Sequence, residues 1–299
     1  MNPPLDCGVS RQIIRRLVSF RSDGVSVLNI DKQVALITGA SSGIGKDFAL
    51  RLLAKGCIVY AAARRVDQMA DIEAAGGFAL AMDVTDDSTM VSGVDRVVRQ
   101  QGRIDILINN AGYGQYGALE DVAIEVARRQ FEVNLFGLAR LTQLCLPHMR
   151  AQKFGRILNI SSIGGRFAAP LGGWYHSSKF ALEGYSDALR NEARRFGIDV
   201  VIIEPGAVQS EWSGIAAQEA KRFSSDGVYA PMVSTMEKFR DGKLKEAPAS
   251  VISDLVIKAL TARTPKARYH GGTLAGPMLF FRRWCSDRMF DKLIMSAFK

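Results

Sequence analysis

Two kinds of hydrophobic periodicity alternate between Lys32 and His270. Short runs of β-branched and other apolar residues are separated by longer stretches in which apolar residues recur every three to four positions. This alternation is typical of a parallel sheet with helices on both faces. Runs such as Val34–Thr38 and Val200–Ile203 are continuously apolar, as expected of central strands that are buried on both faces. The sequence therefore predicts a single α/β domain with a doubly wound parallel sheet.

The pattern predicts seven strands and at least five helices. The strands are expected near Val34–Thr38, Ile58–Ala62, Ala79–Met82, Ile106–Asn109, Arg156–Ile160, Val200–Ile203 and Ala267–Tyr269. The clearest helices are expected at Ile44–Ala54, Ser88–Gln101, Ala123–Arg150, Tyr175–Arg195 and Pro248–Thr261.

Both ends of the chain fall outside this alternation. Residues 1–30 contain a short arginine-rich amphipathic piece, and we expect a poorly ordered extension ahead of a domain over residues 31–275. A targeting peptide is the alternative, although no apolar region with a cleavage-site pattern follows it. Residues 276–299 alternate aromatic and basic residues. This tail is interpreted as a helix packed on the domain, a lid over an apolar site, or a surface that contacts a membrane.

Composition and charge narrow the class of protein. The net charge of +9 is concentrated at the ends: residues 1–30 carry +2, residues 262–299 carry +6, and residues 31–261 carry only +1. A basic groove across the domain is thus not supported, and no nucleic-acid partner is predicted. The four cysteines and three histidines form no metal-binding spacing, so no metal is predicted. The longest apolar stretch near an end is shorter than the ~20 residues that span a bilayer. We expect a soluble, cytoplasmic protein.

A glycine-rich turn follows the first predicted strand and leads into a helix. It has the sequence Thr38-Gly-Ala-Ser-Ser-Gly-Ile-Gly45. Gly39 permits a tight turn, Gly43 lets the backbone approach a pyrophosphate, and Gly45 allows close packing of helix on strand. The helix N-terminus adds free N–H donors and the positive end of its dipole. This context predicts a dinucleotide site that includes Ser41, Ser42 and Ile44, although the spacing G-x-x-x-G-x-G differs from G-x-G-x-x-G.

The end of the second predicted strand indicates which dinucleotide is bound. About 20 residues after the turn, where an acidic residue would hold the ribose 2′-hydroxyl of NAD, the chain has Arg64 and Arg65. Guanidinium groups match a 2′-phosphate in charge and fork geometry. We therefore predict NADP (NADPH) as the cofactor, with Ser41 and Ser42 assisting.

A tyrosine and a lysine stand four residues apart at the start of a predicted helix, in Tyr175-His-Ser-Ser-Lys179. This spacing places a phenol and an ammonium on one face. A nearby ammonium favours phenolate and lowers the pKa of tyrosine, which makes Tyr175 a candidate general acid and base. Ser162 lies 13 residues earlier at a strand end, where its hydroxyl would bond the same substrate oxygen. His176 is assigned to packing.

Together these motifs resemble the short-chain dehydrogenase/reductase family. The resemblance covers Lys32 to about His270. It includes the glycine turn, Asp83-Val84-Thr85, Asn109-Asn110-Ala111-Gly112, Asn134, Ser162, Tyr175/Lys179 and Pro205-Gly206. It implies a Rossmann-type seven-stranded fold and hydride transfer between a nicotinamide and a carbonyl/alcohol pair.

The resemblance also implies individual roles. Tyr175 would donate the proton, Ser162 would orient the carbonyl, and Lys179 would bind the nicotinamide ribose and lower the tyrosine pKa. Asn134 would hold a water that relays protons to Lys179; satisfying a helix kink is its structural alternative. Asp83 would contact the adenine of the cofactor. The remaining cofactor contacts would come from Val84, Asn110, Ala111, Gly112, Pro205, Gly206, Val208 and Ser210. Ser210 stands where the family often has threonine.

The substrate is expected to be a lipophilic carbonyl or alcohol. The segment Glu211–Ala247 is the usual substrate loop of this family, and its aromatic residues, together with Leu171, Trp174 and the tail, offer apolar surface. Sequence details look most like the branch of 17β-hydroxysteroid and retinol dehydrogenases. Two alternatives are a fatty-acyl or polyketide ketoreductase, with Arg128, Arg129 and Arg166 facing an acyl-carrier protein, and a non-catalytic NADP-binding regulator.

The family commonly forms dimers or tetramers through its two long helices. Here these would be Ala123–Arg150 and Tyr175–Arg195. A homodimer or homotetramer is therefore expected by analogy, although the apolar face of the first helix would pack equally well on the sheet.

Overall fold

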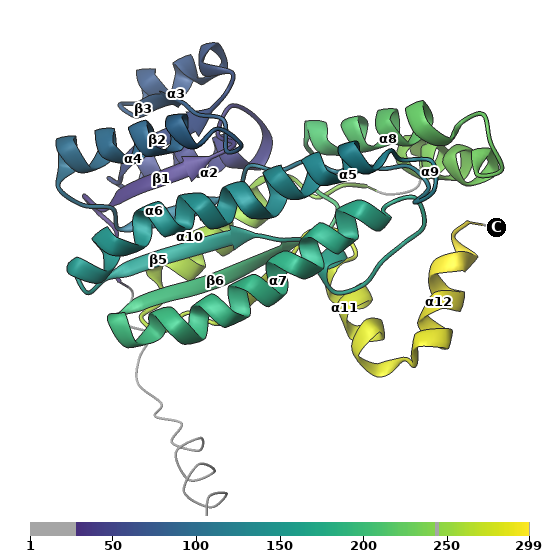
Figure 1. Cartoon of the computed structure of the whole chain (residues 1–299). Coiled ribbons are helices and arrows are strands. Elements are labelled where there is room, and N and C mark those ends of the chain that lie inside the picture. Colours follow the sequence, from purple (N-terminus) through teal and green to yellow (C-terminus); the bar gives the residue numbers. More distant parts are fainter. Residues whose placement is uncertain (1–27, 243–244, 299) are drawn as a thin grey trace, which may run out of the picture.

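All seven predicted strands are present in the computed structural model, which describes residues 28–242 and 245–298. Within these residues the strands form one parallel sheet in the order β3-β2-β1-β4-β5-β6-β7 (Figure 1). Their bounds are β1 Val34–Thr38, β2 Ile58–Ala63, β3 Phe78–Ala81, β4 Ile106–Asn109, β5 Gly155–Ile160, β6 Ile198–Pro205 and β7 Arg268–Gly271. The order reverses between β1 and β4, which creates a switch point at their carboxyl ends. The doubly wound α/β prediction is confirmed.

Helices cover both faces of the sheet. On one face, α2 and α10 pack through Phe48, Leu52 and Val256. On the other face, α4, α6 and α7 pack through Val94, Leu141 and Leu189. The helices are α2 Gly43–Leu53, α3 Ala70–Ala74, α4 Asp87–Gln101, α5 Ile124–Phe131, α6 Leu138–Ala151, α7 Gly173–Ala193, α8 Glu211–Ser224, α9 Ala230–Gly242, α10 Ser250–Thr261, α11 Ala275–Trp284 and α12 Asp287–Ser296, with the short turns η1 Val66–Met69, η2 Glu132–Gly137, η3 Ile163–Gly165 and η4 Arg194–Phe196. No helix within the described ranges has the length and apolar character needed to cross a bilayer.

Two predicted elements differ from the structure. The single helix expected over Ala123–Arg150 is divided into α5 and α6 by the π-helical turn η2. The segment Glu211–Ala247, expected as a loop, is mostly helical, in α8 and α9. These two helices fold because they enclose a small core of their own, made by Ala118, Leu171, Ala220 and Val233.

Both ends of the described domain make contacts with its core. Ile30 is 4% exposed and belongs to the core, and the backbone N–H of Leu28 donates to Thr261 O at 2.6 Å. Residues 1–27 of the predicted extension lie outside the described residues. At the other end, α11 begins at the buried Ala275 and α12 follows it, so the tail is a pair of helices whose first residue belongs to the domain.

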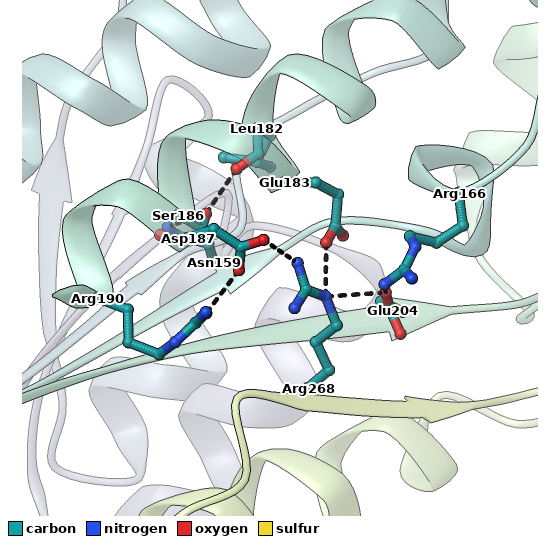
Figure 2. A network of polar contacts seen from close by, with 9 residues as sticks. All are labelled: Asn159, Arg166, Leu182, Glu183, Ser186, Asp187, Arg190, Glu204 and Arg268. Atoms are coloured by element: carbon teal, nitrogen blue, oxygen red, sulfur yellow. Dashed lines mark hydrogen bonds and ion pairs between the residues drawn. The ribbon is translucent and has the colours of Figure 1, made fainter. Parts of the chain in front are cut away.

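A network of charged side chains joins the edge strand β7 to the helix α7 (Figure 2). The Arg268 guanidinium donates to Glu183 Oε2 at 2.9 Å and to Asp187 Oδ2 at 2.7 Å, and its Nε lies 3.5 Å from Glu204 Oε1. The same Glu204 oxygen accepts from Arg166 Nη1 at 3.2 Å. Burial, together with the nearby Glu183, raises the pKa of Glu204 to about 7. The network thus links α7, β6, β7 and the turn that follows Ser162.

Candidate active site

A cleft of about 590 Å³ opens at the carboxyl ends of the strands. It lies at the switch point between β1 and β4, where open α/β sheets bind their ligands. Every residue predicted from the sequence to be catalytic or to bind the cofactor lines this cleft, except Asn134. The predicted residues that line it are Gly39, Ser41, Ser42, Gly43, Ile44, Gly45, Arg64, Arg65, Asp83, Val84, Asn110, Ala111, Gly112, Ser162, Tyr175, Lys179, Pro205, Gly206, Val208 and Ser210.

The glycine turn has the geometry of an anion-binding turn. Gly39 adopts φ +65°, which side chains rarely tolerate, and a Cβ on Gly45 would overlap the Gly39 carbonyl oxygen and the Asn110 amide. The helix α2 begins directly afterwards with no side-chain cap and no acidic residue in its first turn. Its first N–H groups are therefore available to an anion, and the positive end of the helix dipole faces the cleft. These features fit the pyrophosphate of a dinucleotide.

Asn110 and Thr38 hold the floor of the cleft together. The Asn110 side-chain amide donates to Thr38 O at 3.0 Å and to Gly39 O at 3.1 Å. In return, the Thr38 hydroxyl accepts the backbone N–H groups of Asn110 and Ala111, both at 3.0 Å. These bonds join the end of β1 to the end of β4. Asn110 therefore positions the glycine turn in the structure.

A carboxylate distant in sequence lies beside the arginines that were predicted to bind a 2′-phosphate. Glu211 Oε2, in the first turn of α8, lies 3.2 Å from Arg65 Nη2 and accepts from the Ser42 hydroxyl at 3.2 Å. Arg65 Nη2 also donates to Ser42 Oγ at 3.1 Å. The expectation that no carboxylate is available here therefore holds only for the local sequence, and Ser42 contacts Arg65 and Glu211. The three side chains bridge the cleft between α2 and α8.

A further arginine lines the cleft beside Asp83. Arg129 Nη2 lies 3.7 Å from Asp83 Oδ2, and the sequence had suggested Arg129 only as part of a surface for an acyl-carrier protein. Although burial acts to raise the pKa of Asp83, hydrogen bonds from the Thr85 backbone and hydroxyl hold it below its ordinary value, with Arg129 and Arg64 adding to the effect. Asp83 is thus an ionised acceptor at this end of the cleft.

Ser162, Tyr175 and Lys179 meet at the opposite end. Burial raises the pKa of Tyr175 to about 12, and a hydrogen bond with Ser162 partly opposes this rise. Burial lowers the pKa of Lys179 to about 8, and Glu183 opposes this fall. The Lys179 ammonium lies 5.9 Å from the centroid of the Tyr175 ring and donates to Ile160 O at 2.8 Å. Desolvation of the phenol thus sets the direction of the Tyr175 pKa in this structure, and Lys179 is not among the groups that lower it.

Asn134 lies in the π-helical turn η2, behind the cleft. Its Oδ1 accepts from the Tyr113 N–H at 3.1 Å, and its Nδ2 donates to Tyr113 O at 3.0 Å and to Ser178 Oγ at 3.1 Å. Both amide hydrogens are thus used, and one lone pair on Oδ1 remains. A relay water would therefore bind Asn134 only at this remaining lone pair. The observed bonds of Asn134 join η2 to Tyr113 and to Ser178 of α7.

The segment after β6 lines the end of the cleft that holds Ser162. A Cβ on Gly206 would overlap the Thr273 carbonyl oxygen, which explains why glycine stands there. The Ser210 hydroxyl accepts from the Trp212 N–H at 3.4 Å as the N-cap of α8 and donates to Val208 O at 3.3 Å. In this arrangement Ser210 caps a helix, and its predicted bond to a carboxamide requires the hydroxyl to turn away from Val208.

Aromatic rings surround Tyr175. The centroid of the Tyr175 ring lies 5.0 Å from that of Trp212 and 5.9 Å from that of Tyr116, and both rings are apolar surface beside the phenol. Gly114 leaves the room that Trp212 needs, since a Cβ there would overlap the indole. The sequence pointed to Trp212 among the substrate residues but gave no indication of Tyr116, which reaches the site from the loop after β4.

Other predicted substrate residues lie elsewhere. Trp174 lines a separate hollow on the outer face of α5 and η2, because its position on α7 turns it away from the cleft. Leu171 packs in the core beneath α8 and α9. His176 is 5% exposed, its Nδ1 lies 2.9 Å from Gly164 O, and burial lowers its pKa, in agreement with a packing role.

Comparison with known proteins gives consistent matches. The family model for short chain dehydrogenases matches residues 33–226. The chain is 38% identical to a probable short-chain type dehydrogenase/reductase of Helicobacter pylori over 87% of this chain and 96% of that protein. It is 34% identical to an NADPH-dependent 3-dehydrocapnine reductase of Ornithobacterium rhinotracheale, over 89% and 97%. Among solved structures, a short-chain dehydrogenase from Streptomyces avermitilis matches with a TM-score of 0.74 and 32% identity, over 88% of this chain and 96% of that one.

Proposed function

The chain belongs to the short-chain dehydrogenase/reductase family, and we propose that it is an NADP(H)-dependent reductase of a lipophilic ketone or aldehyde. Members of this family are oxidoreductases that interconvert carbonyls and alcohols with a nicotinamide cofactor. The observation that supports this chemistry best is a single cleft with an uncapped glycine turn at one end and Ser162, Tyr175 and Lys179 at the other.

Each of the three side chains has a distinct task in the proposed reduction. The nicotinamide supplies the hydride when it is bound. The Ser162 hydroxyl donates a hydrogen bond to the substrate carbonyl oxygen, and the Tyr175 phenol transfers its proton to that oxygen as the alcohol forms. The Lys179 ammonium, which lines the same cleft, would bind the nicotinamide ribose. With a pKa of about 12, Tyr175 holds its proton at neutral pH, which suits a proton donor.

Charge in the cleft supports NADP over NAD. Arg64, Arg65 and Arg129 line the adenine side, against the carboxylates of Asp83 and Glu211. A 2′-phosphate would add a partner for the arginines, whereas Glu211 opposes it. The relative from Ornithobacterium is named as NADPH-dependent. Replacing Arg64 with alanine should therefore lower the preference for NADPH over NADH by about five-fold or more, because one phosphate-binding guanidinium is lost.

The apolar surface near Tyr175 supports a lipophilic substrate. Tyr116, Trp212 and Ile215 provide this surface. We propose steroid- or retinoid-like carbonyls as the substrates of this surface. The Ornithobacterium relative is named as a reductase of 3-dehydrocapnine. The alternative of a ketoreductase is less well supported. It requires three arginines that face an acyl-carrier protein, and two of them already form ion pairs, Arg129 with Asp83 and Arg166 with Glu204.

The test is oxidation of NADPH, with NADH alongside, against steroid, retinoid and long-chain ketones, small polar ketones and acyl thioesters. Wild type should turn over lipophilic carbonyls with NADPH. Tyr175→Phe should lose at least 10²-fold in kcat, because the proton donor is removed, while Tyr185→Phe, a tyrosine on the same helix outside the cleft, should retain activity. Turnover of acyl thioesters alone would favour the ketoreductase. NADPH binding without any turnover would favour the non-catalytic regulator.

A further inference from the structure

Four apolar side chains form an outward stripe on α11. Pro277, Phe280, Phe281 and Trp284 recur at the spacing of one helical face. Phe280 is 60% exposed and Trp284 is 70% exposed, values that are unusual for rings of this size. The opposite face of α11, which includes Ala275, packs on the domain. The stripe is thus a solvent-facing surface on a helix whose other side is already covered.

The second helix of the tail also carries exposed apolar side chains. On α12, Met289 is 60% exposed and Leu293 is 39% exposed. Figure 1 shows α11 and α12 as a hairpin that projects from the body of the protein. We call the exposed side chains Phe280, Phe281, Trp284, Met289 and Leu293 of these two helices the hairpin surface.

Basic side chains accompany the hairpin surface. Arg283, Arg288 and Lys292 are exposed on the same two helices, and the Arg283 guanidinium lies 5.7 Å from the Trp284 ring. Of the two acidic residues in the hairpin, Asp287 accepts from Arg282 at 2.7 Å. Aromatic rings interleaved with cations suit the boundary of an anionic bilayer, where rings enter the acyl boundary and cations meet headgroups.

The hairpin is fixed to the body close to the catalytic helix. Phe290 of α12 is 4% exposed, and its ring centroid lies 5.4 Å from that of Phe167. The Phe167 ring in turn lies 6.2 Å from His176, the neighbour of Tyr175. A ligand can therefore bind the hairpin surface while Phe290 stays packed on the body of the protein. It would bind near the end of α7 that carries Tyr175.

We propose that the hairpin surface docks the protein onto an anionic phospholipid membrane. Each helix has only ten residues, so the hairpin lies in the interface and does not cross the bilayer. A second copy of the chain is a poorer occupant, because two such surfaces would bring like charges together. The proposal concerns membrane binding alone and stands whether or not the proposed substrate is correct.

The test is co-sedimentation of the full chain with vesicles of phosphatidylcholine mixed with phosphatidylserine, and with vesicles of phosphatidylcholine alone. Wild type should bind the anionic vesicles, and added salt should weaken this binding. The double variant Phe280→Ala/Trp284→Ala should bind about ten-fold or more weakly. Arg283→Gln and Arg288→Gln should each lose about five-fold on anionic vesicles only. The matched controls are Phe136→Ala, an exposed phenylalanine on η2, and Arg99→Gln, an exposed arginine on α4; both should bind as wild type does.

A fluorescence readout tests insertion directly. Brominated phospholipids should quench wild type, and Trp284→Phe should bind equally but be quenched less, because its reporter is gone while its apolar ring remains. Wild type that stays in the supernatant with anionic vesicles at low salt would overturn the proposal. Binding that is insensitive to Phe280→Ala/Trp284→Ala would also overturn it. So would a concentration-dependent dimer that Trp284→Ala abolishes, if vesicles are not bound, because the occupant would then be a second copy.

Discussion

Replacing Lys179 with methionine should abolish catalysis and at the same time stabilise the fold at neutral pH. Lys179 is 7% exposed, and burial lowers the pKa of its ammonium from 10.5 to about 8. A depression of this size means that the charged form is disfavoured in the fold by about 3 kcal/mol. The variant also loses the bond from Nζ to Ile160 O, which offsets about 1–2 kcal/mol. A net gain of about 1–2 kcal/mol in the free energy of unfolding is expected at pH 7.

The pH dependence of this gain identifies its cause. Below pH 8 the lysine is protonated in both folded and unfolded chains, so the cost of burying the charge is fully present. Between pH 8 and 10.5 only the unfolded chain binds the proton, and wild-type stability therefore rises with pH. The advantage of Lys179→Met should consequently shrink from pH 8 upward and vanish near pH 9, because each pH unit adds about 1.4 kcal/mol to wild-type stability. Near pH 10.5 the variant should be less stable than wild type by about 1–2 kcal/mol, since only the lost bond to Ile160 O then remains.

Urea unfolding at pH 7 and pH 10 measures both quantities. Lys221→Met, which removes an exposed lysine of α8, is the matched control and should change stability by less than about 0.5 kcal/mol at either pH. A variant less stable than wild type at pH 7, or a stability difference that is equal at the two pH values, would refute the reasoning. Either result would mean that burying the charged Lys179 ammonium does not destabilise the fold.

Three further changes test other parts of the site. Glu211→Gln should lower the KM for NADPH by about two- to five-fold with little change for NADH, because Arg65 is then released to bind the 2′-phosphate. The effect is small because an exposed ion pair of this kind is worth less than about 1 kcal/mol. Steady-state kinetics with both cofactors measure it, and an equal change in the two KM values would contradict it. Gly45→Ala should weaken NADPH binding by about ten-fold or more, because the added Cβ would overlap the Gly39 carbonyl oxygen and the glycine turn would have to shift. Fluorescence titration with NADPH measures the binding. The control is Gly214→Ala, where an added Cβ would have no atom within 4 Å. Trp212→Ala should raise the KM for lipophilic ketones more than that for small ones, because the apolar wall beside Tyr175 is lost; equal effects on both substrate classes would argue against that wall.

The parts of the fold with local causes were predictable from sequence. The strands followed from continuous apolar runs, because a strand buried on both faces, such as Val34–Thr38, has no polar side to present. The cleft followed from motifs at strand ends, because parallel strands bring their carboxyl ends to one edge of the sheet. These two rules place Gly39 and Asn110 beside each other across 71 residues of chain.

The parts that were missed depend on contacts that no local pattern encodes. Glu211 reaches Arg65 only because α8 folds over the cleft, and α8 folds because of a small core that is formed jointly with Leu171 and Ala118. Tyr116 reaches the site from a segment without a motif, and Arg129, which was assigned to a surface for an acyl-carrier protein, lies beside Asp83. The pKa of Tyr175 depends on how deeply the phenol is buried, and a Tyr-x-x-x-Lys spacing says nothing about depth. Trp174 was assigned to the substrate side, but it points to the outer face of the helix.

The charged network of Figure 2 has a consequence for biosynthesis. Glu183 and Asp187 precede their shared partner Arg268 by more than 80 residues, so a ribosome completes the whole catalytic helix long before it makes this arginine. Until then Glu183, which is 6% exposed in the folded protein, lacks this partner, whereas Asp187 can still pair with Arg190 on the same helix. Because an unpaired carboxylate is costly to bury, we expect the final packing of Tyr175 and Lys179 to wait until the last strand emerges. A nascent chain arrested before residue 268 would hold a complete set of catalytic residues without a stable place for them.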